Sequence, residues 1–304
     1  MRSLTKSLLQ LNLAILSCLA VFNLSAALII VEPSENSYRD IQEALIIAEP
    51  GDVVRLTGGT FLIEDGLSLD VPGVKIEGEG MDASILEFSN QKSGAQGLLV
   101  TSDNVTLQDF AVVNAKGDAI KSKGANNISF IRVKTEWTGG PKTTNGAYGL
   151  YPVESENILI DECVAIGASD AGIYVGQSKN IIVKNSFVKH NVAGIEIENS
   201  FYADVFDNLA EENTGGILVF DLPDLPQQGG HHVRVFNNKV INNNTPNFAP
   251  EGNIVGEVPS GSGIMVMANS HVEVFENRIE NNGTTGIALV SYADDYEDKS
   301  YYPH

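Results

Sequence analysis

The feature that most constrains the fold is a pair of apolar residues, two positions apart, that recurs along most of the chain. Successive pairs lie 22 to 39 residues apart, and polar neighbours alternate with their members. This alternation is typical of a strand with one buried face. The pairs are Val105/Leu107, Ile128/Phe130, Ile158/Ile160, Ile181/Val183, Ala203/Val205, Val233/Val235 and Val272/Val274.

A second repeat, in which glycine precedes an apolar residue, follows the first with the same spacing. Its members are Gly149-Leu150, Gly172-Ile173, Gly194-Ile195, Gly216-Ile217, Gly263-Ile264 and Gly286-Ile287, with Ala119-Ile120 as an earlier one. Two or three short strands per repeat of this length are typical of one turn of a parallel β-helix. Leucine-rich repeats have a similar period, but their Leu-x-x-Leu-x-Leu pattern is absent. The sequence therefore predicts an all-β fold, a single parallel β-helix of about nine turns over residues 28–290.

Two further predictions concern the coil itself. Asn208, Asn238 and Asn277 occupy equivalent positions, so we expect an internal ladder of side-chain amides, with Cys163 buried in the same stack. At the N-terminal end, a capping-box pattern at residues 37–40 precedes a helical apolar face that includes Ile41 and Leu45. We expect this short helix to cap the open first turn.

The two ends of the chain lack the β-helix repeat. A basic start, an apolar stretch and small residues at 25–27 predict a signal peptide over residues 1–27, and hence an exported protein, periplasmic or extracellular. The residues after Cys18 remain apolar, which disfavours lipoprotein anchoring through that cysteine. No later run reaches the ~20 apolar residues of a membrane span. Residues 291–304 form an acidic tail without apolar periodicity, so we expect the last turn to be bare, either because further turns follow or because a protein partner docks there.

The charge of the chain excludes one class of partner. There are 39 acidic and 19 basic residues, for a net charge of −20, and removal of residues 1–27 makes it −22. Nucleic-acid binding rests on Lys and Arg, so we expect none. The same charge repels polyuronates unless cations bridge them.

The residues between the members of the glycine repeat should face outward and form two rows along one sheet. The first row runs from Lys121 to Ala288 and the second from Lys123 to Val290. Long insertions at residues 135–147, 221–232 and 245–262 should wall this face, and we expect them to cover the apolar lower half of the rows. The upper half is the predicted cleft for an extended sugar chain. Its candidate substrate-binding residues are Lys121, Lys123, Tyr151, Glu154, Tyr174, Glu196 and Glu198.

The sequence contains no convincing metal site. His190, His231 and His232 lack ligand spacing to Cys or carboxylates. The acidic run at 294–298 is the only weak candidate for calcium, and it lacks the Asp-x-Asp-x-Asp-Gly pattern. We therefore expect no cofactor.

Two segments carry a family resemblance. Residues 41–56 and 73–80 resemble the opening of secreted right-handed β-helix proteins, which include polysaccharide lyases, epimerases and exported bacterial β-helix-repeat proteins. The resemblance implies a right-handed coil. Residues 148–154 resemble the Tyr-Gly-x-Asp-Pro-His-Asp segment of mannuronan C5-epimerases, but Tyr151 replaces the first Asp and Val153 the His. The catalytic motif is therefore not retained, although Tyr151 or Tyr174 could exchange protons and Lys121 or Lys123 could neutralise a uronate.

Two hypotheses follow. In the first, the protein binds or modifies a carbohydrate polymer, possibly one that contains uronates, through a lyase-like or epimerase-like activity if it is an enzyme. In the second, it is a non-catalytic scaffold of the cell envelope that binds a protein partner.

Overall fold

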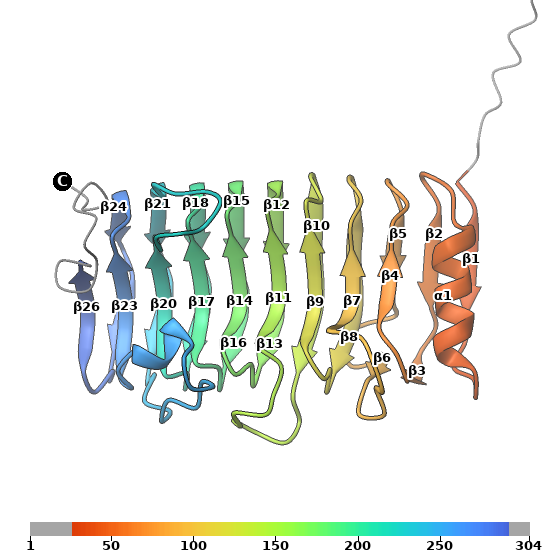
Figure 1. Ribbon diagram of the computed structural model, residues 1–304, viewed down its shortest axis with the longest axis horizontal. Coiled ribbons are helices and arrows are strands. Elements are labelled where there is room, and N and C mark those ends of the chain that lie inside the picture. The colour runs from red at the N-terminus through yellow and green to blue at the C-terminus, as the bar shows by residue number, and fades with distance from the viewer. Residues whose placement is uncertain (1–25, 292–304) are drawn as a thin grey trace, which may run out of the picture.

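The computed structural model describes residues 26–291, which form a continuous coil of short parallel strands (Figure 1). One side of the coil is a nine-stranded sheet in which neighbouring strands come from successive turns. Its strands are β4 (Leu67–Leu69), β7 (Gln96–Val100), β9 (Asp118–Lys123), β11 (Tyr148–Val153), β14 (Ala171–Gly176), β17 (Ala193–Glu198), β20 (Gly215–Phe220), β23 (Ser262–Met267) and β26 (Thr285–Val290). The predicted parallel β-helix is thus confirmed.

The rest of the coil is a 17-stranded sheet with two parallel runs, joined where β8 and β10 pair with both. The first run is β1 (Leu28–Val31), β2 (Val53–Leu56), β5 (Lys75–Glu77), β8 (Thr106–Val113), β10 (Ile128–Glu136), β12 (Glu156–Asp161), β15 (Lys179–Lys184), β18 (Phe201–Phe206), β21 (His231–Phe236) and β24 (Ser270–Phe275). The second run adds β3 (Gly59–Leu62), β6 (Ser84–Glu87), β13 (Val164–Ile166), β16 (Phe187–Lys189), β19 (Leu209–Glu211), β22 (Lys239–Ile241) and β25 (Arg278–Glu280).

The recurring apolar pairs fill the interior of the coil. Ile158, Ile181, Ala203 and Val233 lie in one register column, and each is buried. Stacking like residues on like residues at about 4.8 Å per strand lets one small set of side chains build a continuous core. The strand pattern that the sequence predicted is therefore the pattern of the core.

Amide ladders run along the coil where its strands turn. Asn208 Nδ2 donates to Asn238 Oδ1 at 3.0 Å, and Asn238 Nδ2 donates to Asn277 Oδ1 at 2.9 Å, which confirms the predicted ladder. A second ladder, which the sequence analysis missed, joins Asn191, Asn213, Asn243 and Asn282 in the same way. Cys163 is buried as predicted, and burial raises the pKa of its thiol to about 12.

The helix α1 (Ser37–Ile47) lies at the N-terminal end of the coil, against β1, β3 and β4 (Figure 1). Ile41, Ala44 and Leu45 of this helix are buried in the continuous core. The predicted capping box is wrong, because Asn36 is the N-cap residue and makes no side-chain capping bond. Ser37 is instead the first helical residue, and its hydroxyl donates to the carbonyl oxygen of Ser34.

The expected signal peptide and acidic tail fall largely on residues 1–25 and 292–304, which lie outside the described residues. Between residues 26 and 291, no helix has the length and apolar character needed to cross a membrane. Apart from α1, the described helical structure is the 3₁₀ turn η1 (Ile254–Glu257), which belongs to the insertion between β22 and β23.

Candidate functional site

The predicted inward and outward alternation of the nine-stranded sheet is confirmed. Tyr151 pairs with Lys121 of the preceding turn, and Tyr174 pairs with Glu196 of the following turn. The glycine-repeat residues Leu150 and Ile195 point into the core and are fully buried. The candidate residues on these strands therefore share the outward face of the sheet, whereas Glu154 follows the end of β11.

The insertions cover much of this face, as predicted for its lower half. Leu218 and Met265 of the sheet form a second apolar cluster with Val255 and Val258 of the insertion that precedes β23. Figure 1 shows that insertion folded over the ends of β17 and β20. The outward-facing apolar residues of these rows are thus buried in a small second core between the sheet and the insertion.

The insertion covers more of this face than predicted and reaches the outward side chains of β14 and β17. Tyr174, Glu196 and Glu198 are only 4 %, 3 % and 7 % exposed, so the prediction that they line an open cleft is wrong. The physical reason is the reach of the insertion, whose Asn253 Nδ2 donates to Asp170 Oδ2 at 3.1 Å. That bond holds the cover against the turn before β14.

Three tyrosine rings meet at the boundary between the covered and open parts of the face. The ring centroids of Tyr148 and Tyr151 are 4.4 Å apart, and Tyr174 lies 4.6 Å from Tyr148 and 4.9 Å from Tyr151. Tyr148 and Tyr151 are half-buried, whereas Tyr174 is buried. The rings separate a solvent-accessible side from a covered acidic side.

Four carboxyl groups surround these rings, and we call Asp118, Asp170, Glu196 and Glu198 the acid cluster. The Tyr174 hydroxyl donates to Glu198 Oε1 at 2.6 Å, and the Tyr148 hydroxyl lies 3.4 Å from Asp170 Oδ2. Oε2 of Glu196 is buried and finds no hydrogen-bond partner among the described residues.

Burial raises the pKa of every member of the acid cluster. Desolvation raises the pKa of Asp118 to about 6, and desolvation with repulsion from other carboxylates raises those of Asp170 and Glu198 to about 7. The same causes hold the pKa of Glu196 well above its usual range. Such groups carry and release protons near neutral pH, as acid–base catalysts require.

The tyrosines, in contrast, hold their protons. Desolvation and the nearby carboxylates raise the pKa of Tyr151 to about 12 and raise those of Tyr148 and Tyr174 as well. At neutral pH these hydroxyls are therefore hydrogen-bond donors.

The accessible part of the site, which we call the mouth, consists of Asp118, Lys121 and Tyr151. Lys121 Nζ lies 4.0 Å from Asp118 Oδ2 and 4.2 Å from the centroid of the Tyr151 ring. The side chains of Lys121 and Asp118 are 21 % and 14 % exposed, so both can be reached from solvent. The mouth thus joins a carboxyl group, a cation and an aromatic ring.

Lys123 and Glu154 do not join this group. Lys123 Nζ forms an ion pair with Glu154 Oε1 at 3.3 Å, and both side chains are largely exposed. The two charges neutralise each other at the rim of the coil. Of the seven candidates, Lys121 and Tyr151 lie at the mouth, and Tyr174, Glu196 and Glu198 lie under the cover.

Asp118, Asp170 and Asn253 were not among the residues predicted from the sequence. Asp118 immediately precedes the repeat pair that begins with Ala119, and Asp170 lies two residues before Gly172. Both residues lie within two positions of a member of the glycine repeat, and this proximity is a signal that could have placed them near the same sheet edge. Asn253 belongs to an insertion that lies outside the repeat, so no sequence pattern could have predicted its position.

The described residues offer no ready-made metal site. Between residues 26 and 291, no three His, Cys, Asp or Glu side chains are arranged to hold a metal ion. The weak calcium candidate at residues 294–298 lies outside the described part of the chain.

Comparison with solved structures finds the same coil in carbohydrate-acting enzymes. The mannuronan C-5 epimerase AlgE4 A-module of Azotobacter vinelandii is 17 % identical with a TM-score of 0.53, and the comparison covers 83 % of this chain and 76 % of that one. The AlgE6 A-module of the same organism is 17 % identical with a TM-score of 0.54, covering 85 % and 76 %. The catalytic unit of a GH87 α-1,3-glucanase from Streptomyces thermodiastaticus strain HF3-3 is 17 % identical with a TM-score of 0.58, covering 85 % and 53 %. At this identity the likeness is one of fold.

Among curated proteins, none matches the sequence significantly. A family model does: the right-handed β-helix region matches residues 72–224 and 145–297, which together span well over half of the 304 residues. The handedness implied by the resemblance of the opening segments is thereby confirmed. A coil of parallel strands, a core of stacked apolar residues and this match lead to one conclusion: the chain belongs to the right-handed β-helix family.

Proposed function

We propose that this protein binds a carbohydrate polymer that contains uronates at the mouth and modifies it by acid–base chemistry. The observation that carries the proposal is the grouping of Asp118, Lys121 and Tyr151 on one accessible patch, with the pKa of Asp118 raised to about 6. The epimerase-like segment lacks a carboxylate at Tyr151. Asp118, on the preceding turn of the coil, supplies one beside it.

Each group has a chemical role in this proposal. Proton abstraction next to a uronate carboxylate needs a base, a proton donor and a cation that neutralises the developing charge. Asp118 is the base, because a pKa near 6 leaves it ionised yet basic at neutral pH. Lys121 is the cation. Tyr151, which keeps its proton, is the donor, and its ring offers a face to the sugar.

The fold is consistent with this use. The solved structures that resemble the chain bear the names of two mannuronan epimerases and an α-1,3-glucanase, so right-handed β-helices accommodate extended sugar chains. Such polymers lie outside the cytoplasm, which agrees with the expected signal peptide. We accordingly propose an exported, periplasmic or extracellular protein whose partner is a polysaccharide and which needs no resident cofactor.

The test is activity on a polyuronate. The purified protein is incubated with mannuronan in D₂O, and NMR records deuterium at C5 and any unsaturated product. We expect exchange or elimination with the native protein and a loss of at least ~100-fold for Asp118→Asn, as is usual for a general base. Lys184→Gln, a change on the other sheet, is the control. Undetectable turnover, or equal turnover in Asp118→Asn and the native protein, would contradict the proposal.

One observation favours the second candidate, a scaffold that binds a protein partner. Ile287 and Leu289 of β26 are 50 % and 81 % exposed, and among the described residues this strand pairs with β23 alone. If this strand docks a partner, Leu289→Lys should leave polyuronate turnover unchanged and abolish the association, which light scattering of the mixed components detects.

A further inference from the structure

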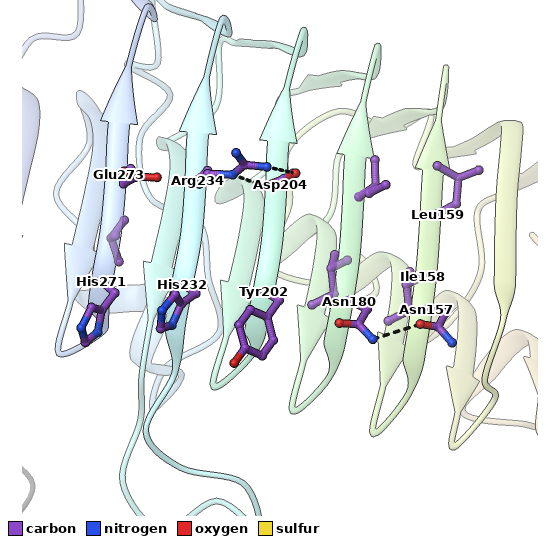
Figure 2. Close-up of a pocket in the computed structure, with 13 residues that line it drawn as sticks. Asn157, Ile158, Leu159, Asn180, Tyr202, Asp204, His232, Arg234, His271 and Glu273 are labelled. Atoms are coloured by element: carbon purple, nitrogen blue, oxygen red, sulfur yellow. Dashed lines mark hydrogen bonds and ion pairs between the residues drawn. The ribbon is translucent and has the colours of Figure 1, made fainter.

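A groove of about 850 Å³ lies on the other sheet of the coil, away from the mouth. It runs across β12, β15, β18, β21 and β24, and most of the side chains that line it come from the outward side of these strands (Figure 2). Five strands at about 4.8 Å spacing give it a length of roughly 19 Å along the coil. The groove therefore has the shape of a site for a chain, not for a compact molecule.

The groove follows a backbone kink that is repeated in every one of these strands. The second residue of each strand is in the left-handed region: Asn157, Asn180, Tyr202, His232 and His271 have φ between 53° and 61°. This region suits asparagine better than large residues. The kink turns one column of side chains outward along the whole groove.

The side chains in this column change character along the coil. At its upper end, Asn157 Nδ2 donates to Asn127 Oδ1 at 2.8 Å, and Asn180 Nδ2 donates to Asn157 Oδ1 at 3.1 Å. From β18 onward the column consists of rings. The centroid of His232 lies 5.2 Å from that of Tyr202 and 4.7 Å from that of His271.

The replacement of asparagine by rings is not explained by folding. An asparagine at each of these positions would fit the backbone and extend the amide ladder, as it does in the preceding turns. Tyr202 is 55 % exposed, so the rings are not part of a core. Unfavourable backbone positions that carry exposed rings are typical of binding sites. We call Tyr202, His232 and His271 the ring column.

The opposite side of the groove carries one cation, Arg234, and two carboxylates, Asp204 and Glu273. Arg234 donates from Nε to Asp204 Oδ1 at 2.7 Å and from Nη2 to Asp204 Oδ2 at 2.5 Å. Glu273 lies on the next strand, and Figure 2 shows these three residues in a row parallel to the ring column. The bidentate pair neutralises itself and holds its remaining donors and acceptors in fixed positions.

We propose that this groove binds a neutral glycan chain that lies along the axis of the coil. Sugars combine apolar faces, which pack on rings and on Leu159 and Ile182, with hydroxyl groups that match paired donors and acceptors. The Arg234–Asp204 pair neutralises itself and Glu273 adds a negative charge, so the groove favours an uncharged ligand over a polyanion. The net charge of −20 likewise disfavours nucleic acids. The choice of a carbohydrate as the ligand rests on the proposed function. The position of the groove does not depend on the mouth.

The experiment is native gel electrophoresis of the purified protein in gels that contain soluble α-glucan, β-glucan or mannan. The test variant carries Tyr202→Asn, His232→Asn and His271→Asn, because asparagine suits the left-handed backbone and extends the ladder. The control is Asp118→Asn, which alters the mouth alone. Thermal unfolding of each variant shows whether the coil is intact, and Tyr202→Asn alone repeats the measurement if the triple variant unfolds.

We expect at least one neutral polysaccharide to retard the native protein and Asp118→Asn equally. The triple variant should bind at least ~10-fold more weakly, or about 1.4 kcal/mol, while its unfolding temperature stays equal or rises. Retardation that persists in the triple variant would contradict the proposal. So would the absence of retardation in all three polymers, which would leave an extended peptide as the occupant. Neither result bears on uronate turnover at the mouth, so the two proposals fail separately.

Discussion

The hydroxyl group of Tyr174 on β14 donates a 2.6 Å hydrogen bond to Glu198 on β17, diagonally across two adjacent strands. Tyr174 belongs to the first outward row and Glu198 to the second, so this bond joins the two rows beneath the cover. It lowers the pKa of Glu198, whereas burial raises it, and burial prevails. The Tyr174 hydroxyl therefore partly offsets the effect of burial on the pKa of Glu198. The ring of Tyr174 also contacts the ring of Tyr151, which belongs to the mouth.

The first prediction concerns this bond. Tyr174→Phe should lower the free energy of unfolding at pH 7 by roughly 1–3 kcal/mol, because a buried carboxylate loses its donor. Urea unfolding measures the change. In a Glu198→Gln background the same substitution should cost clearly less. Equal costs in the two backgrounds would show that the bond does not stabilise the fold.

The second prediction concerns stability and pH. The folded-state pKa values of Asp118, Asp170 and Glu198, about 6 to 7, lie above those of the unfolded chain, so the folded state binds more protons between about pH 4 and 7. This contribution to stability is fully present below pH 4 and is lost as the pH rises through 7. Burial has the same effect on Glu196, whose pKa lies well above its usual range.

Glu196→Gln should accordingly stabilise the protein at pH 8 by roughly 1–3 kcal/mol and reduce the loss of stability between pH 5 and 8. Unfolding in urea at both pH values measures this. Glu251→Gln, in an exposed part of the insertion, is the matched control and should change neither value. If the two substitutions behave alike, the acid cluster is not a source of the pH dependence.

The third prediction concerns the amide ladder. Asn238 donates to the carbonyl oxygen of Val205 as well as to Asn277, and it accepts from Asn208. Asn238→Ala leaves these buried groups without partners and should cost at least about 2 kcal/mol of unfolding free energy. Asn90→Ala, in an exposed turn, should change stability by less than ~0.5 kcal/mol. Thermal or urea unfolding that finds similar costs would refute a stabilising role for the ladder.

The fourth prediction concerns Cys163 in the protein without residues 1–27. Its thiol is buried and its pKa is raised to about 12, so little thiolate exists at neutral pH. The folded protein should not react with a disulfide reagent such as Ellman's, and it should react promptly in denaturant. Rapid reaction of the folded protein would mean that this part of the coil opens.

The repeat made most of the fold predictable. Pairs such as Ile158/Ile160 repeat the same local environment in each turn, so their spacing gave both the strands and the inward side. Asn208, Asn238 and Asn277 followed from the same argument. The capping box was wrong because the Ser37 hydroxyl bonds to the backbone of Ser34, and a local pattern does not reveal that contact.

The site was only partly predictable, because it depends on residues outside the repeat. The outward positions of Lys121, Tyr151 and Glu196 follow from the alternation of the strands. The burial of Glu196 does not, since it is set by an insertion whose Asn253 donates a hydrogen bond to Asp170, 83 residues earlier in the chain. The raised pKa values of Asp170, Glu196 and Glu198 follow from burial under that cover.

The central claim is that the mouth binds a uronate-containing carbohydrate polymer. Its most direct test is a glycan-array measurement on the purified protein, on Tyr151→Ala and on Lys184→Gln, with and without calcium, since bridging cations offset the charge repulsion. We expect binding to uronate oligosaccharides that Lys184→Gln retains and that Tyr151→Ala weakens at least ~10-fold. Unchanged binding in a folded Tyr151→Ala variant, or no binding to any uronate oligosaccharide under either condition, would contradict it.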